Sequence, residues 1–280
     1  MIKNVCIAGA GTMGSGIAQA AAQSGFSTIL FDLNKEIIEK AKAGMQKNLE
    51  SLVVKQKIGS EEAGTIFNRI QFVTDLQCCK ADIIIEAIVE KIEAKATLFN
   101  GLAAINNSTA IFATNTSSLS VSALQKEISG PERVVGMHFF NPATIMKLVE
   151  VVKGEQTGTE AVAQVLELAK QMGKTAVVCK DSPGFIVNRV ARPYYLEAMK
   201  LVERGVATIE TVDSAMQSAG FKMGPFRLMD LIGLDINYAV SCSVYEQMGK
   251  PLRLQPSILQ QQKVLDGKFG IKKGEGFYLY

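Results

Sequence analysis

The sequence contains a single histidine, His138, whose surroundings suit proton transfer. It lies in the run Gly136-Met137-His138-Phe139-Phe140-Asn141-Pro142, at the end of a predicted strand. Ligand sites in open α/β sheets gather at the carboxyl ends of strands. The ordinary pKa of an imidazole suits it to take a proton from an alcohol near neutral pH. His138 is therefore a candidate base, and the alternative is a structural histidine.

A histidine base needs a carboxylate that orients its second ring nitrogen. Glu150 is the candidate, because it lies in the apolar stretch Lys147-Leu148-Val149-Glu150-Val151-Val152 that is predicted to be another strand. A glutamate flanked by aliphatic residues either points outward or is an internal charge with a partner. The sequence leaves both interpretations open.

Two further polar residues follow predicted elements. Ser117 lies in Thr114-Asn115-Thr116-Ser117-Ser118 after a strand, and Asn188 lies on the first helix beyond residue 183. A hydroxyl-rich run commonly caps a helix, and a single asparagine on a helix is commonly exposed. Spacing alone therefore assigns neither residue to chemistry.

A glycine-rich turn near the start of the chain predicts a dinucleotide site. Gly9, Ala10, Gly11, Thr12, Met13 and Gly14 form G-x-G-x-x-G between a strand and a helix, and Asp32 ends the next strand. The glycines allow a tight turn, and the helix N-terminus can receive a pyrophosphate. A carboxylate at Asp32 accepts hydrogen bonds from ribose hydroxyls and repels a 2′-phosphate, so NAD(H) is favoured over NADP(H).

Short apolar runs alternate with helical periodicity through the first two thirds of the chain, which predicts parallel strands joined by helices. The expected fold class is α/β: a Rossmann-type, doubly wound, mostly parallel sheet in residues 1–183, followed by an all-helical C-terminal domain in residues 184–280. Strands are expected at 5–8, 27–31, 72–74, 83–85, 110–112, 133–137, 147–152 and 175–178, and helices at 35–57, 91–105, 160–172, 185–202, 208–219, 228–247 and 257–266.

Composition, charge and cysteine spacing argue against several classes of function. The 280 residues carry 30 Lys and Arg against 27 Asp and Glu, a net charge of +3 with no basic stripe, so a nucleic-acid partner is not expected. No apolar run is long enough for a membrane helix, and the start lacks a signal- or transit-peptide pattern. The five cysteines lack paired spacing, so no metal site or disulfide framework is expected, and we expect reduced thiols and a cytoplasmic location.

Several motifs in order resemble the L-3-hydroxyacyl-CoA dehydrogenase family over essentially the whole chain. They are Gly9 to Gly14, Glu86-Ala87-Ile88-Val89-Glu90, Asn115-Thr116-Ser117-Ser118, His138-Phe139-Phe140-Asn141-Pro142, Lys147 to Val151, Asp181 to Arg189, Gly224-Pro225-Phe226 and Gly274-Glu275-Gly276-Phe277-Tyr278. The resemblance implies NAD(H)-dependent interconversion of (S)-3-hydroxyacyl-CoA, most simply 3-hydroxybutyryl-CoA, and the 3-ketoacyl-CoA.

The resemblance also implies roles for individual residues. His138 would be the base and Glu150 its orienting carboxylate, while Ser117 and Asn188 would hydrogen-bond substrate oxygens. Cofactor contacts are implied for Glu90, Lys95, Ser117 and Asn141, with Lys95 also near the coenzyme A moiety, and coenzyme A phosphate contacts for Lys55 or Lys57. The helical domain would form a homodimer interface and one side of the substrate cleft.

Two other classes of function remain open from the sequence. One is a dehydrogenase of a free hydroxyacid or sugar acid on the same fold, of which some use a helix lysine as base where this chain has Asn188. The other is a non-enzymatic, crystallin-like relative that only binds nucleotide. The complete set of Ser117, His138, Glu150 and Asn188 argues against the second.

Overall fold

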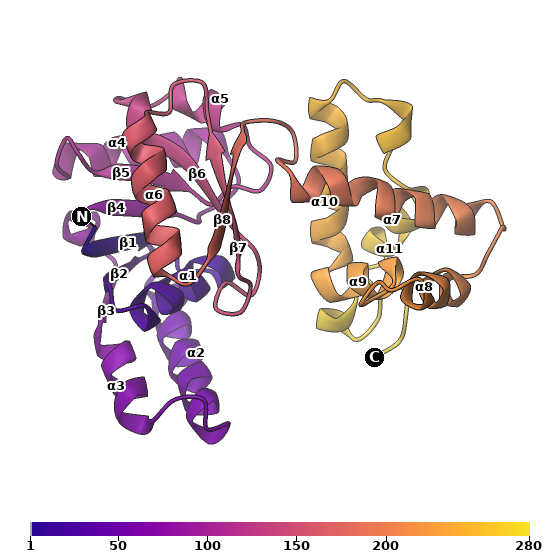
Figure 1. The fold of residues 1–280 in the computed structure, drawn as a ribbon, viewed down its shortest axis with the longest axis horizontal. Helices are drawn as coiled ribbons and strands as arrows, with labels where there is room; N and C mark the ends of the chain where they lie inside the picture. Colours follow the sequence, from indigo (N-terminus) through magenta and orange to yellow (C-terminus); the bar gives the residue numbers. More distant parts are fainter. Residues whose placement is uncertain (1) are drawn as a thin grey trace. The chain divides into compact units, whose positions relative to one another are not determined.

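The computed structural model describes residues 2–280 and divides the chain into two compact units (Figure 1). The first unit extends to Asp181 and the second begins at Ser182. Each unit has its own apolar core.

The first unit is built on one eight-stranded sheet with the order β3-β2-β1-β4-β5-β6-β7-β8. All neighbouring strands are parallel except β6 and β7, which pair antiparallel. The order reverses between β1 and β4, and such a switch point opens a crevice at the carboxyl ends of the strands. The strands are β1 (Asn4–Ala8), β2 (Ser27–Phe31), β3 (Ile70–Val73), β4 (Ile83–Glu86), β5 (Ile111–Thr114), β6 (Val134–Phe139), β7 (Leu148–Lys153) and β8 (Thr175–Lys180).

The two faces of the sheet have different partners because side chains alternate along a strand. One face forms the larger core with α1 (Thr12–Gln23), α2 (Lys35–Val54), α3 (Ser60–Asn68) and α6 (Thr159–Gln171). The opposite face packs on α4 (Ile92–Ile105), where the rings of Phe99 and Phe112 lie 5.3 Å apart. The short helix α5 (Val121–Gln125) follows β5.

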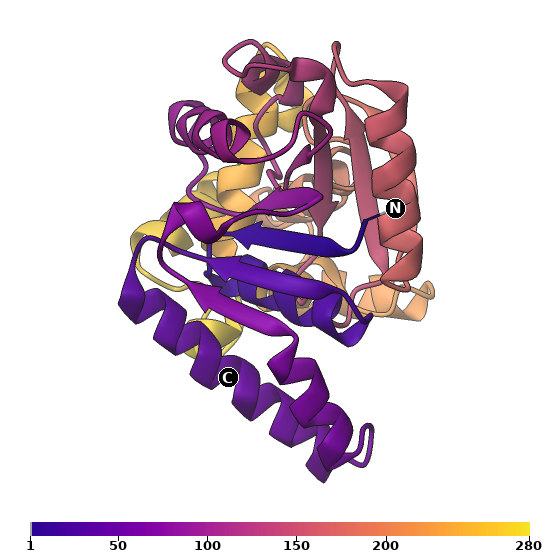
Figure 2. The same ribbon diagram turned by 90° about the vertical axis from the view of Figure 1, so that its left-hand side faces the viewer.

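The helices α2 and α3 lie side by side and extend beyond the sheet (Figures 1 and 2). The helix expected to reach Lys57 ends instead at Val54, and α3 was not expected from the sequence. Gln56 has a left-handed φ of 55°, and the amides of Gln56 and Lys57 donate back to Val53 and Leu52. This paired pattern is a Schellman ending, which closes the helix.

The second unit is formed by helices α7 (Val187–Glu203), α8 (Ile209–Ser218), α9 (Pro225–Ile232), α10 (Leu234–Gln247) and α11 (Ile258–Leu265). The expectation of one helix from Leu228 to Gln247 is wrong, because Gly233 separates α9 from α10 with a φ of 101° that a continuing helix cannot contain. Two buried carboxylates hold its C-terminal segment: Asp230 accepts from the amides of Phe277 and Tyr278, and Asp213 accepts from the Tyr278 hydroxyl.

The predicted fold class is confirmed: a mostly parallel, doubly wound sheet precedes an all-helical unit. Within residues 2–280, none of the helices combines the length and apolar character needed to cross a membrane.

Candidate active site

The structure brings His138 and Glu150 together on neighbouring antiparallel strands. The two residues are direct partners in the β6–β7 register. Nδ1 of His138 lies 2.8 Å from Oε2 of Glu150, and the two residues are 5% and 1% exposed. Glu150 is therefore an internal charge with a partner, which decides between the two interpretations that the sequence left open.

Strand alternation explains why both side chains leave the sheet on one face. Val135 and Met137 of β6, like Val149 and Val151 of β7, belong to the larger core. His138 and Glu150 alternate with these residues, so both point to the opposite face. Just past the histidine, the amide of Phe139 donates to Oδ1 of Asn115, at the end of β5 (2.9 Å).

The glycine turn follows β1, and its three glycines differ in whether a side chain would fit and why. Gly9 has a φ of 105°, and a Cβ there would lie 2.5 Å from the carbonyl oxygen of Ala87. A Cβ at Gly14 would overlap the carbonyl oxygen of Gly9, so the helix passes too close to the turn for any side chain. A Cβ at Gly11, however, would meet nothing within 4 Å. This open position at the α1 N-terminus fits the approach of a dinucleotide pyrophosphate.

Asp32 directly follows β2 and borders the predicted nucleotide site. Its Oδ2 accepts from the amide of Ala10 and its Oδ1 accepts from the amide of Asn34, both at 2.9 Å. The two bonds fix the carboxylate beside the glycine turn, where an adenosine ribose would lie.

We expect Asp32→Asn to weaken the preference for NADH over NADPH by about 10- to 100-fold, because the variant removes a negative charge that repels a 2′-phosphate. Asparagine keeps an oxygen that can accept one of the two amide bonds, so the turn should persist. The measurement is the ratio of kcat/KM for the two cofactors. An unchanged ratio would show that Asp32 does not set the preference.

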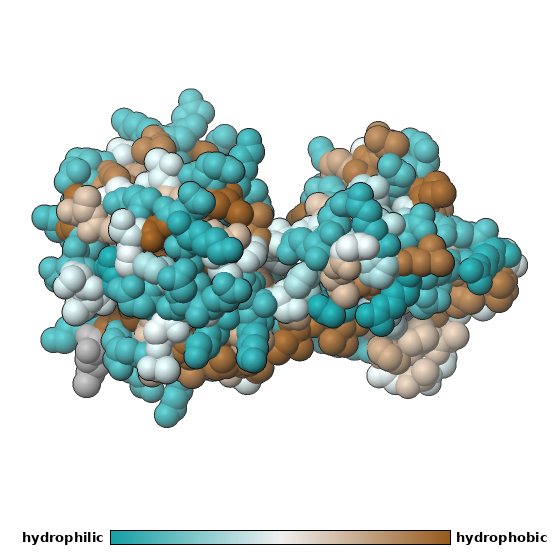
Figure 3. All heavy atoms as spheres, turned by 90° about the horizontal axis from the view of Figure 1, so that it is seen from above, coloured by the Kyte–Doolittle hydropathy of each residue, from teal (hydrophilic) through white to brown (hydrophobic). Residues whose placement is uncertain are grey.

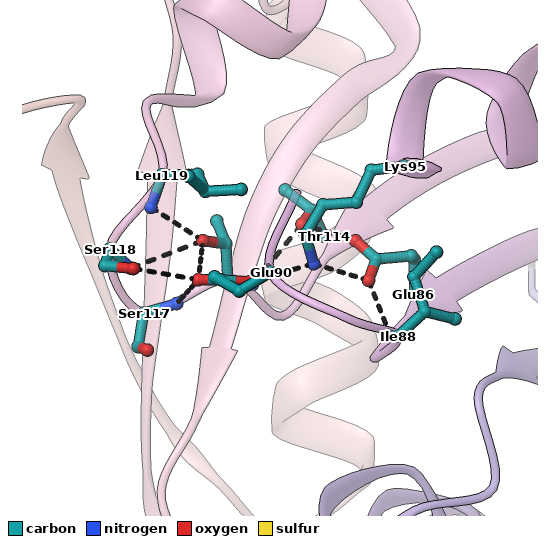
Figure 4. A network of polar contacts seen from close by, with 9 residues as sticks. Glu86, Ile88, Glu90, Lys95, Thr114, Ser117, Ser118 and Leu119 are labelled. Atoms are coloured by element: carbon teal, nitrogen blue, oxygen red, sulfur yellow. Dashed lines mark hydrogen bonds and ion pairs between the residues drawn. The ribbon is translucent and has the colours of Figure 1, made fainter. Parts of the chain in front are cut away.

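A buried charge network lies at the carboxyl ends of β4 and β5 (Figure 4). The ammonium group of Lys95, a residue 1% exposed, lies 2.6 Å from Oε1 of Glu86 and 3.0 Å from Oε2 of Glu90. Glu86 is fully buried, and its second oxygen accepts from the Thr114 hydroxyl at 2.7 Å. Lys95 is thus held between two carboxylates.

The pKa values of the two carboxylates are shifted in opposite directions. Burial raises the pKa of Glu86 above its ordinary value, even though Lys95 and Thr114 act against it. Burial also acts to raise the pKa of Glu90, but the Lys95 charge and the hydrogen bonds from Thr116 and Ser118 outweigh it, so that pKa is lowered. Glu90 is therefore the more firmly ionised of the two.

The ionised Glu90 organises the loop that carries Ser117. Its Oε1 accepts from the hydroxyl of Thr116 at 2.5 Å, from the amide of Ser117 at 3.1 Å and from the hydroxyl of Ser118 at 3.1 Å. The Thr116 oxygen in turn accepts from the amide of Leu119 at 2.8 Å. The loop is thereby tied to the Glu86–Lys95–Glu90 network, as Figure 4 shows.

We expect Lys95→Met to lower the free energy of unfolding by about 3–5 kcal/mol, because it leaves the fully buried Glu86 carboxylate without a counter-ion. The loss should shrink as the pH falls. Lys95 acts to lower the pKa of both carboxylates in the folded protein, so without it Glu86 and Glu90 bind protons more readily in the folded variant, and acid restores more stability to the variant than to wild type. Denaturant unfolding across pH measures both effects.

The matched control is Lys91→Met, at an exposed lysine one helical turn earlier, which should change stability little. Adding Glu86→Gln to Lys95→Met should recover part of the loss. Equal effects at Lys91 and Lys95 would contradict this account of the network.

The other residues singled out in the sequence belong to other segments of the chain. Asn141 is exposed and precedes Pro142 through a cis peptide bond. Lys55 and Lys57 are exposed in the turn after α2. Asn188 is partly exposed on the first turn of α7, in the second unit.

A groove of about 420 Å³ lies between α2 and α3, close in sequence to Lys55 and Lys57. Its apolar lining includes Leu49, Val53 and Phe67. Neither lysine lines this groove, so their contact with coenzyme A phosphates stays a prediction.

A glycine turn at the switch point of a doubly wound sheet, with an acidic residue ending the next strand, defines a dinucleotide-binding α/β protein. Residues 4–182 match the family described as 3-hydroxyacyl-CoA dehydrogenase, NAD binding domain, and residues 184–280 match 3-hydroxyacyl-CoA dehydrogenase, C-terminal domain. The chain therefore belongs to the 3-hydroxyacyl-CoA dehydrogenase family, and its cofactor is NAD(H).

Individual relatives agree with this membership. The chain is 46% identical over 279 residues to 3-hydroxyadipyl-CoA dehydrogenase of Escherichia coli, covering 99% of this chain but 59% of that protein. It is 40% identical over 288 residues to the mitochondrial hydroxyacyl-coenzyme A dehydrogenase of Sus scrofa, covering 100% of this chain and 92% of that protein. The crystal structure of (S)-3-hydroxybutyryl-CoA dehydrogenase from Ralstonia eutropha has a TM-score of 0.94 at 36% identity, covering 100% and 99% of the two chains.

Sequence reasoning gave no role to Glu86, Thr114 or Asn115, although the structure places all three beside the site. A signal was present for Glu86, because a carboxylate that directly follows Ile83-Ile84-Ile85 ends a buried strand at the ligand edge of the sheet. Thr114 and Asn115 follow the next strand in the same way.

Proposed function

We propose that the protein catalyses NAD(H)-dependent interconversion of (S)-3-hydroxyacyl-CoA and 3-ketoacyl-CoA, with the 3-hydroxybutyryl/acetoacetyl pair as the simplest substrate. The observation that carries the proposal is the buried His138–Glu150 pair, at the ligand edge of a sheet that also holds the dinucleotide turn. The family membership supports the same substrate class. The chain spans 59% of the length of its E. coli relative, so the activity of that whole protein is not carried over to this chain.

His138 acts as the base through Nε2. Glu150 accepts the hydrogen bond of Nδ1–H at 2.8 Å, which fixes the tautomer in which Nε2 is the basic nitrogen. The 3-hydroxyl proton moves to Nε2 during oxidation, and the Glu150 carboxylate stabilises the imidazolium that forms. Bound NAD⁺ supplies the acceptor for the hydride that leaves C3.

Hydroxyl and amide side chains complete the proposed site. Ser117 and Asn188 hydrogen-bond the substrate oxygens near C3 and the thioester, so that donors already in place meet the charge that develops on oxygen. Glu90 and Asn141 border the cofactor. Lys95 contributes chiefly through Glu90, because its ammonium group is buried between two carboxylates.

A homodimer is the proposed assembly. Large apolar side chains are exposed on the second unit, among them Val190, Val206, Leu252 and Leu279. Figure 3 shows apolar atoms of this unit reaching the surface in several places. Exposed apolar surface of this kind is consistent with a protein partner.

The test compares (S)-3-hydroxybutyryl-CoA with free (S)-3-hydroxybutyrate as substrates for NAD⁺ reduction. We expect turnover of the thioester and none of the free acid. Turnover of the free acid alone would move the protein to the class of free-hydroxyacid dehydrogenases. No turnover of either would favour a nucleotide-binding protein without this activity.

A further inference from the structure

Arg192 is a charged residue that lies buried in the second unit. It lies on α7, one helical turn after Asn188, and is 3% exposed. Within residues 2–280, no carboxylate lies within ion-pair distance of its guanidinium group. Burial lowers the pKa of Arg192 to about 10. Burying a charge without a carboxylate partner is costly, and hydrogen bonds to neutral acceptors offset only part of that cost.

The hydrogen bonds of Arg192 connect two helices through neutral acceptors. Its Nε donates to the carbonyl oxygen of Asn188 at 3.0 Å. Its Nη1 donates to the carbonyl oxygen of Asn237 at 2.9 Å and to the hydroxyl of Ser241 at 3.0 Å, both on α10. The guanidinium also lies 4.9 Å from the ring centroid of Tyr195. One planar group thus joins the first turn of α7 to α10.

The entry to α7 is irregular, and one of its early backbone hydrogen bonds is missing. The helix begins after Ile186, and Phe185 before it has a left-handed φ of 48°. Pro193 lies inside the helix and has no N–H, so the carbonyl of Arg189 cannot receive the usual amide bond from four residues on. Asn188 lies within this weakened turn.

We infer that Arg192 is a positioning residue, whose guanidinium holds the first turn of α7 on α10 and so fixes the Asn188 side chain for its substrate contact. The inference rests on the proposed function of Asn188. Stability alone is a weak reason for this residue, since apolar residues of similar size often replace buried charges at no cost. Methionine is such a residue, so Arg192→Met removes the hydrogen bonds while keeping much of the volume.

The first experiment is a double-mutant cycle on acetoacetyl-CoA reduction by NADH, with wild type, Arg192→Met, Asn188→Ala and the double variant. We expect Arg192→Met alone to lower kcat by about 10- to 100-fold, the range that a small misplacement of a site residue produces. In the Asn188→Ala background it should cause no further loss. The KM for NADH should stay unchanged. Arg192→Lys should recover little, because one ammonium cannot join both helices as the planar fork does.

Arg227→Met is the matched control. The exposed Arg227 guanidinium lies 4.3 Å from the ring centroid of Tyr278, so it makes the same kind of aromatic contact in the same unit, and among the described residues its side chain has no hydrogen bond to α7. We expect its kcat to equal that of wild type. Equal losses from Arg192→Met in both backgrounds, or wild-type kcat in Asn188→Ala, would overturn the inference.

A second measurement does not depend on activity. Amide hydrogen exchange in the first turn of α7 should be faster in Arg192→Met than in wild type, and unchanged in Arg227→Met. Unchanged exchange in Arg192→Met would overturn the inference even if the enzyme is active. Faster exchange in Arg192→Met, together with no thioester turnover by the wild-type protein, would instead place the failure with the proposed function.

Discussion

His138→Asn is expected to lower kcat for acetoacetyl-CoA reduction by about 10²- to 10⁴-fold, the usual contribution of a positioned acid or base. Asparagine is polar and can still hydrogen-bond Glu150, so the buried carboxylate keeps a partner. It cannot exchange a proton with the substrate oxygen in the neutral pH range. Steady-state kinetics measure the effect.

NADH binding is the control for this variant, since the glycine turn and Asp32 follow β1 and β2, whereas His138 lies on β6. Titration of NADH fluorescence should give a Kd close to that of wild type. Equal loss of binding and turnover would identify His138 as a structural residue rather than a base.

Glu150→Gln is expected to lower kcat by about 10²- to 10⁴-fold as well, with little change in KM. The amide keeps the shape of the side chain, but it removes the charge that stabilises an imidazolium and can reverse the tautomer preference of the ring. Removing a buried charge by an isosteric amide should cost little stability compared with breaking an ion pair from one side. A kcat within a factor of about two of wild type would remove Glu150 from the mechanism.

Cys179 provides a readout of the Glu150 charge that does not use turnover. Burial, and then the negative charges of Glu150 and Asp181, raise the pKa of the Cys179 thiol to about 11. Glu150→Gln removes one of these charges, so the thiol pKa should fall and alkylation at a given alkaline pH should be faster. The experiment uses a Cys78→Ser background, because Cys78 is exposed. An unchanged alkylation profile would mean that Glu150 carries no charge in the folded protein.

The dinucleotide half of the fold could be predicted from sequence because its signals are local. A strand, a glycine turn, a helix and Asp32 occur within one continuous stretch, and each position has a separate steric or electrostatic reason. The site at β6 and β7 was also accessible, because both strands are apolar runs in which His138 and Glu150 are the polar exceptions. What the sequence could not supply was their register, which depends on the antiparallel pairing of these strands.

The side-chain environments that the sequence could not supply depend on contacts between distant segments. In the sequence, Lys95 has the pattern of an ordinary helix lysine, and only the fold shows that it lies between Glu86 and Glu90. Arg192 likewise has the pattern of an ordinary charged helix residue, and only the fold shows that its guanidinium group donates hydrogen bonds to α10. The two helix boundaries that were predicted wrongly have a local cause, a positive φ at Gln56 and at Gly233, but the apolar periodicity of the sequence around them suggested that the helices continue.

The most direct test of the account is the initial rate of NADH oxidation with acetoacetyl-CoA, compared with NADPH as cofactor and with free acetoacetate as substrate. The account predicts rapid NADH-dependent reduction of the thioester, slower reduction with NADPH and none of the free acid. Faster reduction with NADPH would contradict the role of Asp32. No reduction of the thioester with either cofactor would contradict the central claim that His138, Glu150, Ser117 and Asn188 form the active site of a 3-hydroxyacyl-CoA dehydrogenase.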